Sequence, residues 1–155
     1  MNNQLNIPVG ISDFKKIREN DYYYIDKSGL IKELLKRESA EVTLITRPRR
    51  FGKTMGMSML AHFFDIRSDN RRLFDGLEIT RNEALCSAWM NQYPVVFLTL
   101  KDIDGLTFED AYERLAVQIS NLYKEHAYLL ESERMDSDDR TLFKELKVEV
   151  RERFR

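Results

Sequence analysis

The sequence has few of the residues that mark secreted or membrane proteins. It contains one cysteine, three prolines and six glycines among 155 residues. The single cysteine, Cys86, excludes an internal disulfide framework and is typical of a reducing compartment. No apolar run approaches the roughly 18 residues that a membrane helix needs. The first residues also lack the basic and apolar regions of a secretory signal. We therefore expect a cytoplasmic protein with no membrane partner.

A net charge of one sign is also lacking. The chain has 25 Lys and Arg against 26 Asp and Glu, a formal net charge of −1. A basic field over the whole protein, as in many nucleic-acid-binding proteins, is thus excluded. The two histidines, His62 and His126, stand alone, so we expect no zinc site. Basic residues do gather locally, in residues 47–53.

The stretch 42–64 contains the residues that predict a binding site. The apolar run 42–46 predicts a strand and residues 55–64 predict a helix. Strand, tight loop, Gly-Lys-Thr and helix is the layout of a phosphate-binding P-loop. Amides at the helix start, with the helix dipole, would attract an anion. Lys53 would reach the β- and γ-phosphates of a nucleotide, and the Thr54 hydroxyl would bind Mg²⁺.

The loop departs from the P-loop pattern at Arg47, where the motif has glycine. A side chain there resists a positive φ by roughly 1 kcal/mol. Either the turn is reshaped, for which Pro48 is suited, or the loop no longer closes on phosphate. The plainer interpretation is a basic surface turn; the flanking strand and helix favour the phosphate site. We expect the nucleotide to contact Arg47, Pro48, Arg49, Arg50, Phe51, Gly52, Lys53, Thr54 and Met55.

The segments before the loop read as helical and aromatic. Residues 12–17 begin with a capping residue and predict one or two helical turns. Asp26 or Ser28 can cap the helix that follows, whose apolar face consists of Leu30, Ile31, Leu34 and Leu35. The tyrosines of residues 22–24 are expected to pack against the domain; a contact to adenine or ribose is the alternative.

After the loop, the pattern predicts a second strand between helices. Residues 73–79 could form a small hairpin or an irregular excursion, and residues 82–92 read as a weak helix. The apolar run 95–100 predicts a buried parallel strand. With 42–46 it makes a βαβ-type unit. A long helix follows a capping box at Thr107. Residues 131–140 read as a loop, and a last helix starts at about residue 141.

Four stretches carry a resemblance to a known family. They are Ile7-Pro8-Val9-Gly10-Ile11-Ser12-Asp13-Phe14, Tyr23-Tyr24-Ile25-Asp26-Lys27-Ser28, Leu44-Ile45-Thr46-Arg47-Pro48-Arg49-Arg50-Phe51-Gly52-Lys53-Thr54 and Pro94-Val95-Val96-Phe97-Leu98. The chain resembles the bacterial AAA-ATPase-like family, predicted ATPases of the P-loop superfamily, in which arginine in place of the first glycine is habitual.

The resemblance implies an ATP-binding α/β domain with ATP and Mg²⁺ as cofactors. The expected fold is a P-loop NTPase-type three-layer α/β/α arrangement with a parallel sheet, here incomplete. Relatives are usually much longer and often carry a PD-(D/E)xK nuclease-like domain. We therefore expect a single domain over residues 1–155, the N-terminal portion of such a protein. Its parts would be a helical and aromatic segment (1–40), a βαβ core (42–100) and a helical part (107–155).

Hydrolysis needs a second acid that orients Mg²⁺ beside the P-loop strand. The weak candidate is Asp102, which follows the apolar run 95–100. Such acids normally end the apolar run itself, whereas Asp102 lies just beyond it. Asp102 is therefore either a catalytic residue that helps to bind the metal or a solvated acid of a loop or helix start. We expect this chain to bind nucleotide and leave its ATPase activity open.

Two other functions compete with nucleotide binding. The basic loop from Arg47 to Lys53 could grip a phosphodiester backbone, which would make the chain a nucleic-acid-associated module, acting through the full-length protein. Alternatively, the loop is vestigial and the chain is an interaction fragment whose exposed edges are covered in a homo-oligomer.

Overall fold

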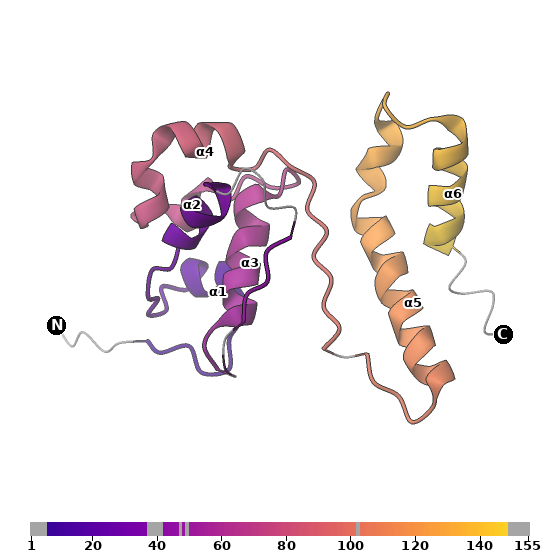
Figure 1. Ribbon diagram of the computed structural model, residues 1–155, viewed down its shortest axis with the longest axis horizontal. Helices are drawn as coiled ribbons and strands as arrows, with labels where there is room; N and C mark the ends of the chain where they lie inside the picture. The colour runs from indigo at the N-terminus through magenta and orange to yellow at the C-terminus, as the bar shows by residue number, and fades with distance from the viewer. Residues whose placement is uncertain (1–5, 37–41, 47, 49, 102, 149–155) are drawn as a thin grey trace. The chain divides into compact units, whose positions relative to one another are not determined.

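A computed structural model of the protein describes residues 6–36, 42–46, 48, 50–101 and 103–148 (Figure 1). The chain divides into two compact units, Met1–Val95 and Val96–Arg155. Regular structure in the described residues consists of α-helices and short 3₁₀ helices. None of the described helices is long and apolar enough to cross a membrane.

The predicted parallel sheet, and with it the α/β class, is wrong: over the described residues no strand forms. Residues 42–46 and 95–100, the two predicted strands, have no regular secondary structure. Most of their side chains are exposed, among them Leu44 to 84% and Leu100 to 64%. An extended run becomes a strand only where another segment pairs with its N–H and C=O groups. The described structure is therefore helical, without the predicted βαβ core.

The first unit is built from short helices. They are α1 (Phe14–Glu19), α2 (Gly29–Leu35), α3 (Lys53–Phe64), η1 (Arg71–Phe74), η2 (Glu78–Arg81) and α4 (Glu83–Trp89). Helix α1 forms where one or two turns were predicted, but its cap is Asp13 and not the first residue of the segment: the Asp13 carboxylate accepts hydrogen bonds from the amides of Lys15 and Lys16. Residues 73–79 form no hairpin; they lie in η1, η2 and a turn at Gly76, whose φ is 77°.

Aromatic rings form the core of this unit. Phe14 of α1, Phe63 of α3 and Phe74 of η1 are fully buried. The ring centroids of Phe14 and Phe74 lie 5.0 Å apart, and those of Phe63 and Phe74 lie 5.4 Å apart. Burying such rings stabilises a domain by about 1.5–3 kcal/mol each. The remaining buried members of the cluster are Ile31, Met59, Leu73, Leu77, Ile79 and Met90.

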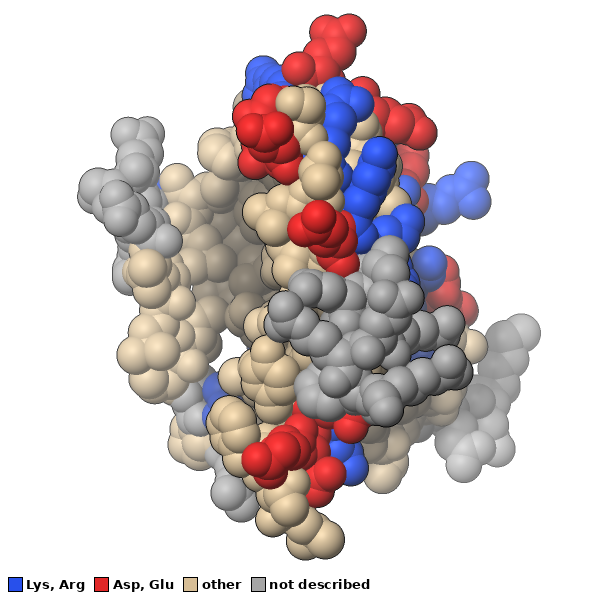
Figure 2. All heavy atoms as spheres, turned by 90° about the vertical axis from the view of Figure 1, so that its right-hand side faces the viewer, with Lys and Arg blue, Asp and Glu red and all other residues tan. Residues whose placement is uncertain are grey.

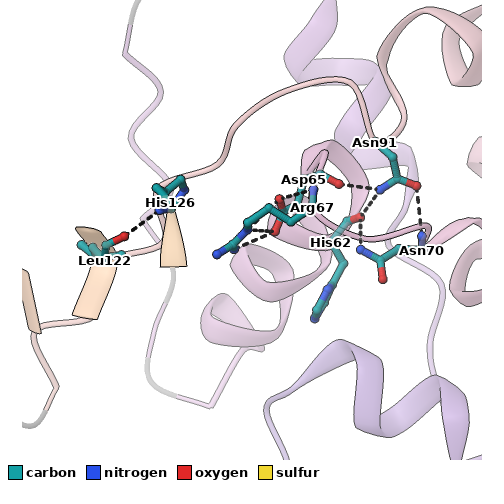
Figure 3. A network of polar contacts seen from close by, with 7 residues as sticks. All are labelled: His62, Asp65, Arg67, Asn70, Asn91, Leu122 and His126. Atoms are coloured by element: carbon teal, nitrogen blue, oxygen red, sulfur yellow. Dashed lines mark hydrogen bonds and ion pairs between the residues drawn. The ribbon is translucent and has the colours of Figure 1, made fainter. Parts of the chain in front are cut away.

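Polar side chains fix the C-terminal end of α3 (Figure 3). The amides of Asn70 and Asn91 both donate to the carbonyl of His62, at 3.1 and 3.2 Å. Asn91 also donates to the carbonyl of Asp65 at 2.9 Å. The Arg67 guanidinium pairs with the Asp65 carboxylate at 2.7 Å. Carbonyls that the helix end leaves unpaired are satisfied in this way, which anchors α3 at one end.

The second unit is a helical hairpin with α5 (Phe108–Glu125), η3 (Ala127–Glu131) and α6 (Ser137–Val148). The predicted capping box is confirmed: the Thr107 hydroxyl accepts from the Asp110 amide and the Asp110 carboxylate accepts from the Thr107 amide. Helices α5 and α6 pack through Tyr123 and Phe143, with ring centroids 4.7 Å apart.

Helix α6 begins earlier than the predicted residue 141. The Asp136 carboxylate accepts hydrogen bonds from the amides of Asp138 and Asp139, at 2.9 and 2.8 Å. This local cap starts the helix at Ser137, inside a stretch whose polar composition had indicated a loop. His126 is buried, and its Nδ1 contacts the Leu122 carbonyl at 2.8 Å (Figure 3).

Candidate functional site

The site predicted from the sequence lies where the chain enters α3. Gly52 is the N-cap residue and has a φ of 74°, in the left-handed region. Arg50 shares this conformation with a φ of 69°, at a cost of about 1 kcal/mol for a residue with a side chain. The first bond of the helix runs from the Gly56 amide to the Gly52 carbonyl, at 2.9 Å. The amides of residues 53–55 therefore precede the helix ladder, without a side-chain cap from Gly52.

Lys53 and Thr54 open the helix and are exposed. The Lys53 ammonium turns back over the loop and donates to the Pro48 carbonyl at 3.2 Å. Thr54 follows at the next position of the first turn, and Met55 is half-buried. A lysine and a threonine thus follow Gly52 at the start of α3, in the order that a phosphate-binding loop requires.

A cavity of about 340 Å³, which we call the loop cavity, lies against this entry. Lys27, Gly52 and Lys53 contribute to its wall, with apolar surface from residues of α2 and α3 and the segments before α3. Its remaining lining residues are Leu30, Ile45, Phe51, Gly56 and Met57. The predicted site is therefore hollowed, and two lysines are among its lining residues.

Sequence reasoning missed Lys27 as a member of this site. Its Nζ donates a long hydrogen bond of 3.5 Å to the Phe51 carbonyl. A Cβ built on Gly52 would meet the same Nζ at 3.3 Å. Lys27 and Phe51 are separated by 24 positions. The spacing of residues along the chain gives no signal for such a contact.

The residues on each side of Lys27 hold it in place. The Asp26 carboxylate accepts from the amides of Ser28 and Glu78, at 2.8 and 2.7 Å. The buried Ser28 hydroxyl accepts from the Ile79 amide at 3.1 Å. Burial alone would raise the pKa of Asp26, but the hydrogen bonds from Glu78 and Ser28 outweigh it and lower the pKa. Asp26 and Ser28 thus tie this segment to η2, and Ser28 makes no side-chain cap on α2.

Of the tyrosines in residues 22–24, Tyr24 packs against the domain, as expected from the sequence. Its ring meets Phe14 edge-on with centroids 5.4 Å apart, and its hydroxyl contacts the sulfur of Met59 at 3.3 Å. Burial raises the pKa of Tyr24. This ring belongs to the core of the first unit, beside α3.

Three of the predicted site residues, Arg47, Arg49 and Asp102, lie outside the described residues. The roles predicted for them stay predictions. Among the described residues, no group of three His, Cys, Asp or Glu side chains could hold a metal ion. Thr54 is therefore the described residue to which the Mg²⁺ prediction applies.

Charges of both signs occur on one face of the molecule (Figure 2) and around one further hollow. Acidic and basic side chains are interspersed on the face drawn in Figure 2. A hollow of about 450 Å³ beside η2 is lined by charges of both signs, Lys32 and Arg81 with Glu78 and Glu83. It shares no lining residue with the loop cavity.

Comparison with known families decides the affiliation of the chain. The AAA-ATPase-like family model, described as a predicted AAA-ATPase, matches residues 8–154. The chain belongs to this family. The match covers both units and confirms the resemblance seen in the sequence. No solved structure matches the chain.

One curated relative comes from Azotobacter chroococcum mcd 1. It is named "Uncharacterized protein in vnfD 5'region" and is 38% identical over 91 residues. Those residues are 58% of this chain and 16% of the relative. The chain thus corresponds to a small part of that protein's length.

Proposed function

We propose that this chain binds the phosphates of ATP, together with Mg²⁺, at the loop that precedes α3. The observation that carries the proposal is the start of α3. Gly52 turns into the helix in the left-handed conformation, and the amides of residues 53–55 stand before the first helical hydrogen bond. Membership in a family of predicted AAA-ATPases supports a nucleotide as the anion.

The amides at the helix start, Lys53 and Thr54 each have a distinct part in binding. The amides at the helix start donate to phosphate oxygens, and the helix dipole adds partial positive charge there. The Lys53 ammonium, which donates to the Pro48 carbonyl in the structure, exchanges this acceptor for a phosphate oxygen. The Thr54 hydroxyl offers an oxygen ligand to Mg²⁺. When bound, Mg²⁺ neutralises charge on the phosphates.

The cavity beside these residues leaves room for part of the nucleotide. The loop cavity of about 340 Å³ adjoins Gly52 and Lys53 and gives room for part of a nucleotide. At Gly52 a side chain would crowd Lys27 and would strain the positive φ. Glycine therefore keeps the helix start open to an anion.

Titration calorimetry with ATP and Mg²⁺ tests this proposal. The wild type is expected to bind, and Lys53→Ala is expected to bind at least about tenfold more weakly, because a hydrogen bond to a charged group contributes about 1.5–3 kcal/mol. Lys15→Ala is a matched control, since Lys15 lies on α1 in an exposed pair with Glu19. Equal affinity in the wild type and Lys53→Ala, or no binding by the wild type at millimolar ATP, would contradict the proposal.

The proposal also concerns hydrolysis, partners and location. We propose that any ATPase reaction is performed by the longer protein of which this chain is the nucleotide-binding portion. Binding to nucleic acid through that protein, self-association and a cytoplasmic location remain predictions from the sequence.

A further inference from the structure

We propose that Lys27 is a second phosphate-binding cation of the loop, which acts with Lys53 on a polyphosphate chain. This inference rests on the proposed function and adds a residue to the same site. Lys27 comes from the segment before α2, outside the Gly-Lys-Thr motif. Two lysines from separate segments would then hold the anion.

The position of Lys27 is the first support. Its ammonium lies beside Gly52, where an added Cβ would be only 3.3 Å away. It lines the loop cavity together with Lys53. Two lysines that line one cavity favour a ligand with several negative charges, because each ammonium attracts it.

The bonding state of Lys27 is the second support. Among the described residues its ammonium has no carboxylate at ion-pair distance, and its hydrogen bond to the Phe51 carbonyl is long, at 3.5 Å. The adjacent carboxylate of Asp26 accepts from two backbone amides instead. A charge-assisted bond to a phosphate oxygen is stronger than this contact to a carbonyl.

The anchoring of Lys27 is the third support. Asp26 and Ser28 are both bonded to the backbone of residues 78–79, so the segment is tied to η2 at both sides of Lys27. The backbone is therefore held before a ligand arrives, and less conformational entropy is lost on binding. Asp26 and Ser28 act as positioning residues, whereas Lys27 itself would touch the ligand.

The test uses Mg²⁺–ATP and Mg²⁺–tripolyphosphate, since the second ligand lacks base and ribose. Calorimetry compares the whole chain with Lys27→Met, Lys27→Arg, Lys53→Met and the control Lys32→Met. Lys32 lies on α2 and lines the other hollow. We expect Lys27→Met to weaken both ligands about tenfold, Lys27→Arg to keep most of the affinity, and Lys32→Met to bind as the wild type does.

Three results would overturn the inference. If Lys27→Met binds both ligands normally while Lys53→Met does not, Lys27 is no phosphate ligand although the proposed function stands. If the wild type binds neither ligand, both proposals fall. If Lys27→Met lowers the melting temperature without ligand and Lys27→Arg does not restore binding, Lys27 merely supports the loop through the Phe51 carbonyl.

Discussion

At the scale of single residues, Asp26 shows how one carboxylate can organise two segments. It accepts the amides of Ser28 and Glu78, which joins the segment before α2 to the start of η2. We expect Asp26→Asn to lower the free energy of unfolding by about 1 kcal/mol, since one of the two acceptors becomes a donor. Urea unfolding at pH 7 measures this difference, and Asp21→Asn, on an exposed residue, is the control.

The same carboxylate makes a prediction about pH. Because the folded-state pKa of Asp26 is lowered, its contribution is present above the unfolded-state pKa of about 3.9 and is lost as pH falls through the folded pKa. The stability difference between the wild type and Asp26→Asn should therefore shrink below about pH 4. A difference that is unchanged from pH 7 to pH 3 would show that the charge of Asp26 is irrelevant.

Residue patterns predicted only part of the site. Lys53 and Thr54 were identified because a glycine, a lysine and a hydroxyl occur in consecutive positions before a helix. Lys27 was not identified, because it contacts a residue 24 positions away in the sequence. That contact also depends on the hydrogen bonds that join Asp26 and Ser28 to η2. Arg50 was expected to contact nucleotide, but its positive φ has no signature in its own residue type.

At the scale of elements, α5 depends on its capping box. Thr107→Ala removes the hydroxyl that accepts the Asp110 amide and should destabilise the second unit by about 1 kcal/mol. Hydrogen exchange should then be faster at the amides of the first turn of α5. Thr141→Ala is a comparison, because its hydroxyl bonds within α6 to the Ser137 carbonyl. Unchanged exchange in α5 would mean that the cap contributes nothing.

Helices were predictable and strands were not, for a physical reason. A helix pairs its own backbone, so the apolar spacing around Met59 and Phe63 and the cap at Thr107 suffice to indicate α3 and α5. A strand needs a partner segment. The runs 42–46 and 95–100 have the composition of strands, yet the described residues provide them with no sheet. Composition predicted two strands, and neither forms in the part of the chain that the structure describes.

At the scale of the whole molecule, family membership and the α3 entry support the same account. The family model spans both units, and its description as a predicted AAA-ATPase agrees with a phosphate site before α3. The matched part of the Azotobacter relative is 16% of its length. Phosphate binding before α3 is the part of the proposed function that the described residues of this chain can test.

The central claim is that the amides opening α3 receive phosphate. Amide chemical shifts of ¹⁵N-labelled protein, followed while Mg²⁺–tripolyphosphate is added, test it most directly. The account predicts saturable shifts centred on Gly52, Lys53, Thr54 and Met55, with smaller shifts near Lys27 and none in α6. Shifts spread over exposed lysines without saturation, or a spectrum in which residues 52–55 do not move, would contradict it.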